Sequence, residues 1–193
     1  MRDTAEAVFL RDGYAAATMD EVARRAGMSK RTLYQLFPSK AALFEAVMED
    51  YLAPFHIDIA IEAEPDIAKA LTAILDVAGR HLLAPRRSGI FRLIVAEVHR
   101  YPELADAFHR AGPGRGASSL ERRIAAEMEK GTLRASDPEA AASMLFAMAI
   151  GSVHIKMLLG LCAPPDDAAI TGRIRDAVTI FLSGAATDRG THG

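Results

Sequence analysis

Apolar residues recur at intervals of three and four along almost the whole chain, and no stretch alternates between apolar and polar residues between hairpin turns. Such spacing puts the apolar side chains on one side of a helix, whereas a half-buried strand needs a period of two. Aromatic residues make up only 6% of the sequence and tryptophan is absent, which also favours helix over sheet. The sequence therefore predicts an all-α protein.

The composition excludes several other classes of protein. With 193 residues, 50% of them hydrophobic, the chain can bury a core that needs no disulfide or metal for stability. Cys162 is the single cysteine, which excludes an internal disulfide framework and a four-thiolate zinc site. The formal net charge of −2 does not by itself indicate a nucleic-acid partner. Because the N-terminus lacks the apolar core of a secretory signal, we expect a cytoplasmic protein.

The residues from Ala140 to Leu161 are long and apolar enough to suggest a membrane span. However, Lys156 and His154 lie within this stretch, Asp137 shortly precedes it, and no basic cluster flanks it. We therefore expect a buried helix of a globular protein and no membrane partner.

Near the N-terminus, the sequence has the signals of two short helices joined by a tight link. Thr18 and Glu21 have the spacing of a capping box, in which the Thr hydroxyl accepts from the Glu amide and the Glu carboxylate returns to the Thr amide. Gly27 can end that helix in a left-handed conformation, and a second helix from Lys30 to Phe37 would stop at Pro38. This is helix-turn-helix geometry, and the second helix is about 12 Å long, comparable to the width of a DNA major groove.

The local charge around this motif is positive although the overall charge is not. From Val22 to Phe44 there is no acidic residue, so the window carries positive charge only, and DNA phosphates could lie against it. The five cations of the window are Arg24, Arg25, Lys30, Arg31 and Lys40.

A further helix begins after Ser39, which can cap it, and ends before Pro54. The segment between Pro54 and Pro65 has no clear periodicity, which indicates a boundary. We predict two domains, residues 1–53 and residues 54–193.

The N-terminal motif resembles the TetR family of bacterial transcriptional regulators. The resemblance is carried by MDEVARRAG at residues 19–27, MSKRTLY at 28–34 and FPSKAAL at 37–43, and more loosely by PELA at 102–105, GTLR at 131–134 and DPE at 137–139. It implies a three-helix DNA-binding domain joined to a C-terminal helical bundle for ligand binding and dimerisation. Leu36 departs from the family pattern, which usually has histidine or another aromatic residue there.

The resemblance also implies which residues contact double-stranded DNA. Tyr34 would donate its hydroxyl to a phosphate, although it also fits a partly buried packing role. Thr18 and Lys40 would hold the DNA backbone, and Leu33 also fits the protein core. The groove contacts implied are Ser29, Lys30, Arg31, Thr32 and Leu33.

No constellation of residues for catalysis is visible in the C-terminal half. The six histidines and Cys162 form no metal-spaced pair, and the sequence has neither a GxSxG motif nor a phosphate-binding glycine loop. We predict no enzyme activity, no catalytic residue, no metal and no cofactor. His81 and His154 lie in apolar helical stripes, where a hydrogen-bonded core histidine is the simplest interpretation.

The methionines of the C-terminal half, such as Met128 and Met157, have two interpretations. Methionine fills irregular cores, and it also lines adaptable pockets for apolar ligands. The family resemblance favours a pocket for a small-molecule effector of unknown identity, with His81 as a polar anchor. The predicted lining is Leu75, Phe91, Phe108, Met144 and Met148.

The last two helices carry too many apolar residues for a solvated surface, and one helix-turn-helix recognises only half a palindromic site. We therefore predict a homodimer built from these helices. The predicted interface is Leu145, Met148, Ser152, Ile155, Leu159, Ile174, Val178 and Phe181. The function expected is a repressor that leaves a palindromic operator when a small apolar molecule binds. The alternatives are an activator, or a helical ligand-binding or protein-interaction scaffold without sequence-specific DNA binding.

Overall fold

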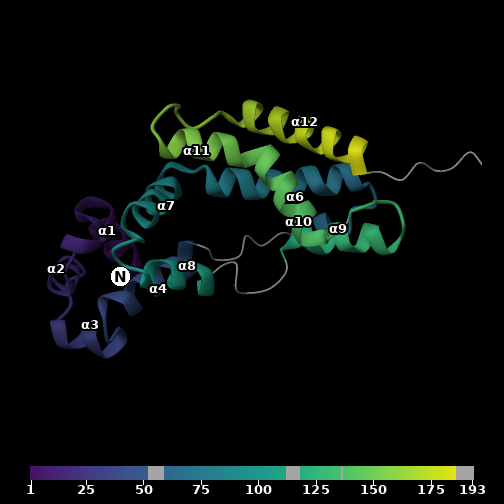
Figure 1. Cartoon of the computed structure of the whole chain (residues 1–193). Helices are drawn as coiled ribbons and strands as arrows, with labels where there is room; N and C mark the ends of the chain where they lie inside the picture. The colour runs from purple at the N-terminus through teal and green to yellow at the C-terminus, as the bar shows by residue number, and fades with distance from the viewer. Residues whose placement is uncertain (52–58, 112–117, 136, 186–193) are drawn as a thin grey trace, which may run out of the picture. The chain divides into compact units, whose positions relative to one another are not determined.

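The computed structural model describes residues 1–51, 59–111, 118–135 and 137–185. Within these ranges the regular elements are helices, as the periodicity predicts (Figure 1). In chain order they are α1 (Arg2–Ala16), α2 (Met19–Arg25), α3 (Lys30–Leu36), α4 (Lys40–Tyr51), α5 (Ile59–Glu62), α6 (Ile67–Leu82), α7 (Pro85–Glu97), α8 (Glu103–Ala111), α9 (Ser119–Glu129), α10 (Pro138–Phe146), the π-helical turn η2 (Ala147–Gly151), α11 (Ser152–Leu158) and α12 (Asp167–Ala185).

The helices form two compact units. Unit 1 consists of the described residues of 1–54 and 85–116, and so joins α7 and α8 to the first four helices. Unit 2 consists of the described residues of 55–84 and 117–193. The predicted boundary between residues 53 and 54 lies outside the described residues and stays a prediction.

The core of unit 1 is centred on aromatic side chains from α1 and α4. Phe9, Tyr14 and Phe44 are buried, and their ring centroids lie 5.3 to 5.8 Å apart. Gly13 has a φ of +77°, which interrupts the helical path of α1 just before Tyr14. A Cβ on Gly13 would lie 3.2 Å from Oε1 of Glu97. The glycine thus permits both the positive φ and the close approach of α7.

Local capping places α2 and α3 as the sequence predicts. The Thr18 hydroxyl accepts a hydrogen bond from the Glu21 amide at 3.2 Å, and Gly27 ends the turn after α2 with a φ of +66°. The Ser29 hydroxyl accepts from the Thr32 amide at 3.1 Å at the start of α3. Ser39 caps α4 in the same way, through the Ala42 amide. These bonds satisfy amides that have no partner within their own helices.

The core of unit 2 is formed by α6, α9, α12 and the run from α10 to α11. Asp137 and Pro138 begin α10 with a side-chain cap and a proline in the first turn. By length and composition alone, the run Pro138–Leu158 could cross a membrane. Its buried side chains, among them Leu145 and Ile150, pack in the unit 2 core, as expected for a helix inside a globular domain.

The π-helical turn η2 is held by an arginine from α12. The guanidinium of Arg173 donates to the carbonyl oxygens of Met148 and Ala149 at 2.9 Å each and to the Ser152 hydroxyl at 2.8 Å. A π-helical turn disturbs the regular pairing of carbonyls with amides, and Arg173 supplies donors at that point.

Candidate nucleic-acid interface

One side of α3 is exposed and polar, while the other packs into unit 1. Arg31, Tyr34 and Gln35 are exposed and share one face because they are three and four residues apart. Tyr34 is 49% exposed, so its hydroxyl contact with a phosphate and its partly buried packing role both stay predictions. Lys30 and Thr32 are also exposed.

Leu33 lies on the opposite face and its side chain is fully buried. The helical spacing that exposes Arg31 and Tyr34 turns Leu33 into the core. The contact between DNA and the Leu33 side chain implied by the family resemblance is therefore incompatible with this structure. Gln35, which the sequence analysis did not single out, is exposed instead.

The hydroxyl-bearing residues at the start of α3 are ordered by one another. The Ser29 and Thr32 hydroxyl oxygens lie 2.8 Å apart, within hydrogen-bond distance, in addition to the capping bond to the Thr32 amide. Thr18 is exposed at the start of α2. The predicted groove and backbone contacts at these three positions are thus accessible, and whether they touch DNA stays a prediction.

The basic window that is free of acids in sequence is not free of them in space. Glu21, predicted to return to the Thr18 amide, instead accepts from Arg24 at 2.9 Å through both carboxylate oxygens, and from Arg25 at 2.6 Å. It also accepts from Arg11 at 3.2 Å. The bond from Arg24 lowers the pKa of Glu21 below its usual range, so the carboxylate is charged at neutral pH.

The other cations of the window differ in their partners. Lys30 is paired with Asp20. Among the described residues, Arg31 alone of the five has neither an ion-pair nor a hydrogen-bond partner. Arg31 is therefore the cation of α3 that can meet a base or a phosphate without first losing a contact in the protein.

Lys40 is directed into the protein. Its ammonium donates to the carbonyl oxygens of Tyr14, Ala15 and Ala17 at 2.7, 3.2 and 3.1 Å. It also lies 4.5 Å from the centroid of the Tyr14 ring, and burial lowers its pKa. Lys40 thus closes the C-terminal end of α1, where carbonyls need donors. The implied phosphate contact stays a prediction that competes with this structural role.

The residues predicted to line an effector pocket fall in both units. Phe91 and Phe108 pack on the unit 1 core with their ring centroids 5.7 Å apart. In unit 2, Leu75 is fully buried, Met148 is half-buried in the core and His81 is half-buried. Met144 is 65% exposed because that side of α10 faces away from the unit 2 core, so Met144 does not line a pocket inside unit 2.

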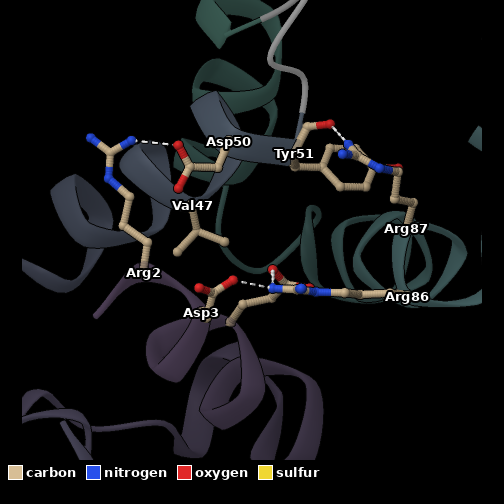
Figure 2. Close-up of a pocket in the computed structure, with 8 residues that line it drawn as sticks. Arg2, Asp3, Val47, Asp50, Tyr51, Arg86 and Arg87 are labelled. Carbon is tan, nitrogen blue, oxygen red and sulfur yellow. Dashed lines mark hydrogen bonds and ion pairs between the residues drawn. The ribbon is translucent and has the colours of Figure 1, made fainter. Parts of the chain in front are cut away.

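A polar cavity of about 180 Å³ in unit 1 lies between α1, α4 and α7 (Figure 2). Arg86 donates to both carboxylate oxygens of Glu6 at 2.5 and 2.6 Å and to Asp3 at 2.6 Å. Arg87 donates to the Tyr51 carbonyl and lies over the Tyr51 ring. This cavity was not predicted from the sequence. Arg86 and Arg87 lie in the first turn of α7, where the positive end of the helix dipole disfavours cations. Their presence there could have indicated that acidic side chains lie nearby.

The predicted dimer residues divide by exposure. Ser152 and Ile155 of α11 and Leu159, the residue directly after α11, are exposed and follow one helical stripe. Leu145, Ile174 and Val178 are buried in the unit 2 core, and Phe181 is half-buried there. The first three of these four cannot reach a second chain unless the core opens, so their place in the predicted interface is corrected.

Comparison with known proteins gives two family matches along the chain. Residues 2–47 match the family of bacterial regulatory proteins named tetR, and residues 69–184 match the C-terminal domain described as that of AefR-like transcriptional repressors. These matches cover both ends of the described fold.

Solved structures agree with this assignment over nearly the full length. A TetR-family transcriptional regulator from Mesorhizobium loti is 25% identical, with a TM-score of 0.76 over 96% of this chain and 95% of that one. The flavonoid-responsive regulator FrrA is 26% identical, with a TM-score of 0.75 over 98% of this chain and 96% of that one.

A known activator matches a short part of this chain. The transcriptional activator FasR of Mycolicibacterium smegmatis, described as HTH-type, is 52% identical over 48 residues, which are 25% of this chain and 22% of that protein. The chain therefore matches about a fifth of the length of this relative.

Proposed function

Because this chain belongs to the TetR family of bacterial transcriptional regulators, we propose that it is a cytoplasmic repressor that binds a palindromic operator as a homodimer and is released by a small apolar molecule. The observation that carries the DNA-binding part is the exposed polar face of α3, with Arg31 free of partners among the described residues. A helix of this kind, placed second in a helix-turn-helix, enters the major groove. The proposed contacts are Thr18, Ser29, Lys30, Arg31, Thr32 and Tyr34.

Arg31 gives the sharpest test of this interface. An arginine that binds a guanine with two hydrogen bonds discriminates by about 1 to 3 kcal/mol. Arg31→Ala should therefore weaken binding to the promoter DNA next to the gene about tenfold or more, and binding to random duplex much less. Arg134→Ala is the matched control, because Arg134 is exposed in unit 2. Fluorescence anisotropy with both duplexes measures the effect.

The proposed dimer interface is the exposed stripe that runs along α11 to Leu159. Ile155 is 58% exposed and Leu159 is 67% exposed, and apolar side chains so placed mark an interaction surface when they are contiguous. Two recognition helices about 34 to 36 Å apart could then occupy successive major grooves. Leu159→Asp should give monomers in sedimentation, while Val95→Asp, at an exposed apolar position in unit 1, should leave a dimer. A wild-type monomer at micromolar concentration would contradict the dimer.

Repression is favoured over activation by the extent of the two similarities. The match to the repressor family's C-terminal domain spans residues 69–184, whereas the match to the activator FasR spans 48 residues in all. Transcription in vitro from the bound promoter should fall when the protein is added. A rise would support the activator alternative, and no DNA binding at all would support the scaffold.

Release by an apolar molecule is supported by where Phe91 and Phe108 lie. Both pack against the core that also contains Phe44 and Met48 of α4, so a ligand between these rings would press on the helices that carry α3. The similarity to a flavonoid-responsive regulator suggests flat aromatic compounds as the first class to screen.

The effector test has two steps, because a ligand can bind without regulating. A thermal-shift screen finds compounds that stabilise the protein, and operator titration then measures their effect on DNA affinity. A tenfold loss of operator affinity requires the ligand to prefer the DNA-incompetent state by about 1.4 kcal/mol. Compounds that stabilise the protein but leave operator affinity unchanged would contradict this mechanism.

A further inference from the structure

Two acidic side chains lie among the cations of the proposed DNA face. Glu21 takes four hydrogen bonds from three arginines, and its side chain is only 25% exposed. Asp20, next to it on α2, is paired with Lys30 of α3. These carboxylates occupy the cations as a phosphate would, since both groups accept the same charge-assisted bonds from guanidinium and ammonium groups.

We propose that Asp20 and Glu21 act as internal competitors of DNA phosphates, which hold down the affinity of this protein for DNA of any sequence. The inference rests on the proposed DNA-binding function and adds to it a feature that sets the overall affinity for DNA. In a helix-turn-helix the first helix crosses the DNA backbone, which would bring the arginines in the last turn of α2 to the phosphates. Each phosphate must then displace a carboxylate before it gains a cation.

The carboxylates hold the cations weakly enough for DNA phosphates to replace them, but strongly enough to lower the affinity for DNA. An exposed ion pair changes an equilibrium constant by no more than about fivefold, so phosphates can replace the carboxylates. Arg24 and Lys30 are 70% and 66% exposed at their side chains, and thus remain within reach of DNA. Binding to random duplex depends almost entirely on such phosphate contacts. Operator binding uses phosphate contacts as well and adds base contacts, so the carboxylates lower both affinities by about the same factor.

The experiment removes each carboxylate and keeps its size. Glu21→Gln and Asp20→Asn are compared with wild type and with Glu129→Gln, which makes the same charge change at an exposed position in unit 2. Affinity for a random duplex and for the operator duplex is measured from 50 to 200 mM salt, and thermal unfolding checks that each variant is folded.

We expect Glu21→Gln to bind random duplex about fivefold tighter than wild type and Glu129→Gln. The slope of log affinity against log salt should steepen by at most about 0.9 for each freed cation, because in the wild type a carboxylate competes with the phosphate at that cation. Asp20→Asn should shift in the same direction by less, because one cation is freed. The ratio of operator to random affinity should stay about the same in both variants, because both affinities rise by the same factor.

A purely structural role for the two acids predicts a different pattern. The pairs of Glu21 with Arg24 and Arg25 are also helix-stabilising contacts, so their loss alone would lower the unfolding temperature without changing random-duplex affinity. Random-duplex affinity and salt slopes equal to those of Glu129→Gln, or lower affinity, overturn the proposal. If Glu21→Gln does not fold, Asp20→Asn decides, because Asp20 is 55% exposed. A wild-type protein that binds no duplex would contradict the proposed function instead.

Discussion

Lys40 offers a prediction in which the structure and the family resemblance lead to different results. Replacing Lys40 with methionine keeps the apolar stem of the side chain and removes the ammonium that closes α1. We expect the free energy of unfolding to fall, while the salt dependence of the DNA affinity stays the same.

The size of the stability loss follows from the contacts that disappear. Three carbonyl oxygens lose a charged donor, and the Tyr14 ring loses a cation at 4.5 Å. A single hydrogen bond contributes about 1 kcal/mol net, and more when one partner is charged. Because Lys40 is only half-buried, water can replace part of what is lost. The expected loss is about 2 kcal/mol, or roughly 4 to 8 °C in the unfolding temperature.

The assay combines thermal unfolding with anisotropy titrations at several salt concentrations. Lys69→Met is the control, because Lys69 is exposed on α6. If Lys40 instead binds a phosphate directly, the salt slope of Lys40→Met becomes shallower by about 0.9. An unchanged unfolding temperature together with that shallower slope would refute the structural role.

Three further predictions concern one helix cap and two contacts made by arginine side chains. Ser29→Ala should cost about 1 kcal/mol of stability through the lost cap of α3, measured by chemical denaturation against wild type. Arg173→Met should speed amide exchange in Ala147–Gly151, and unchanged exchange would show that η2 does not need this arginine. The hydrogen bond from Arg80 lowers the pKa of Asp76 in the folded protein below its unfolded value near 4. The ionised Asp76 carboxylate therefore stabilises the fold above pH 4, and this stabilisation is lost as the pH falls through the folded pKa. Asp76→Asn should therefore flatten the acid limb of the stability profile.

The helices and their ends could be predicted from sequence because the causes are local. Thr18 and Ser39 cap helices in the structure as predicted, and Ser29 and Asp137 cap helices in the same way. Gly13 is a local signal of the same kind, because a glycine can take a positive φ that ends a helical segment. Its non-helical φ and ψ divide α1 into two helical segments, the second of which ends at Ala16.

Apolar residue types did not distinguish a core from an interface. Leu145, Ile174 and Val178 have the same chemistry as Ile155 and Leu159, yet the first three are buried inside unit 2 and the last two are exposed. The choice depends on which side of each helix meets the next helix, and this is set by packing between segments far apart in the sequence. The same reason explains why Leu33 is buried while its neighbours on α3 are exposed.

The charge that the proposed DNA face offers to phosphates also depends on contacts between segments, and a count along the sequence misses it. The difference can be measured as the salt dependence of DNA binding. A count along the chain finds five cations between Val22 and Phe44 and no acid, which predicts a salt slope near −4.5 per protomer if all five meet phosphates. In space, Glu21 and Asp20 hold three of these cations and the end of α1 holds Lys40. Arg31 is left without a competitor among the described residues. Wild-type binding to random duplex should therefore show a clearly shallower slope per protomer. A slope of −4.5 or steeper would mean that these intramolecular pairs do not limit contact with phosphates.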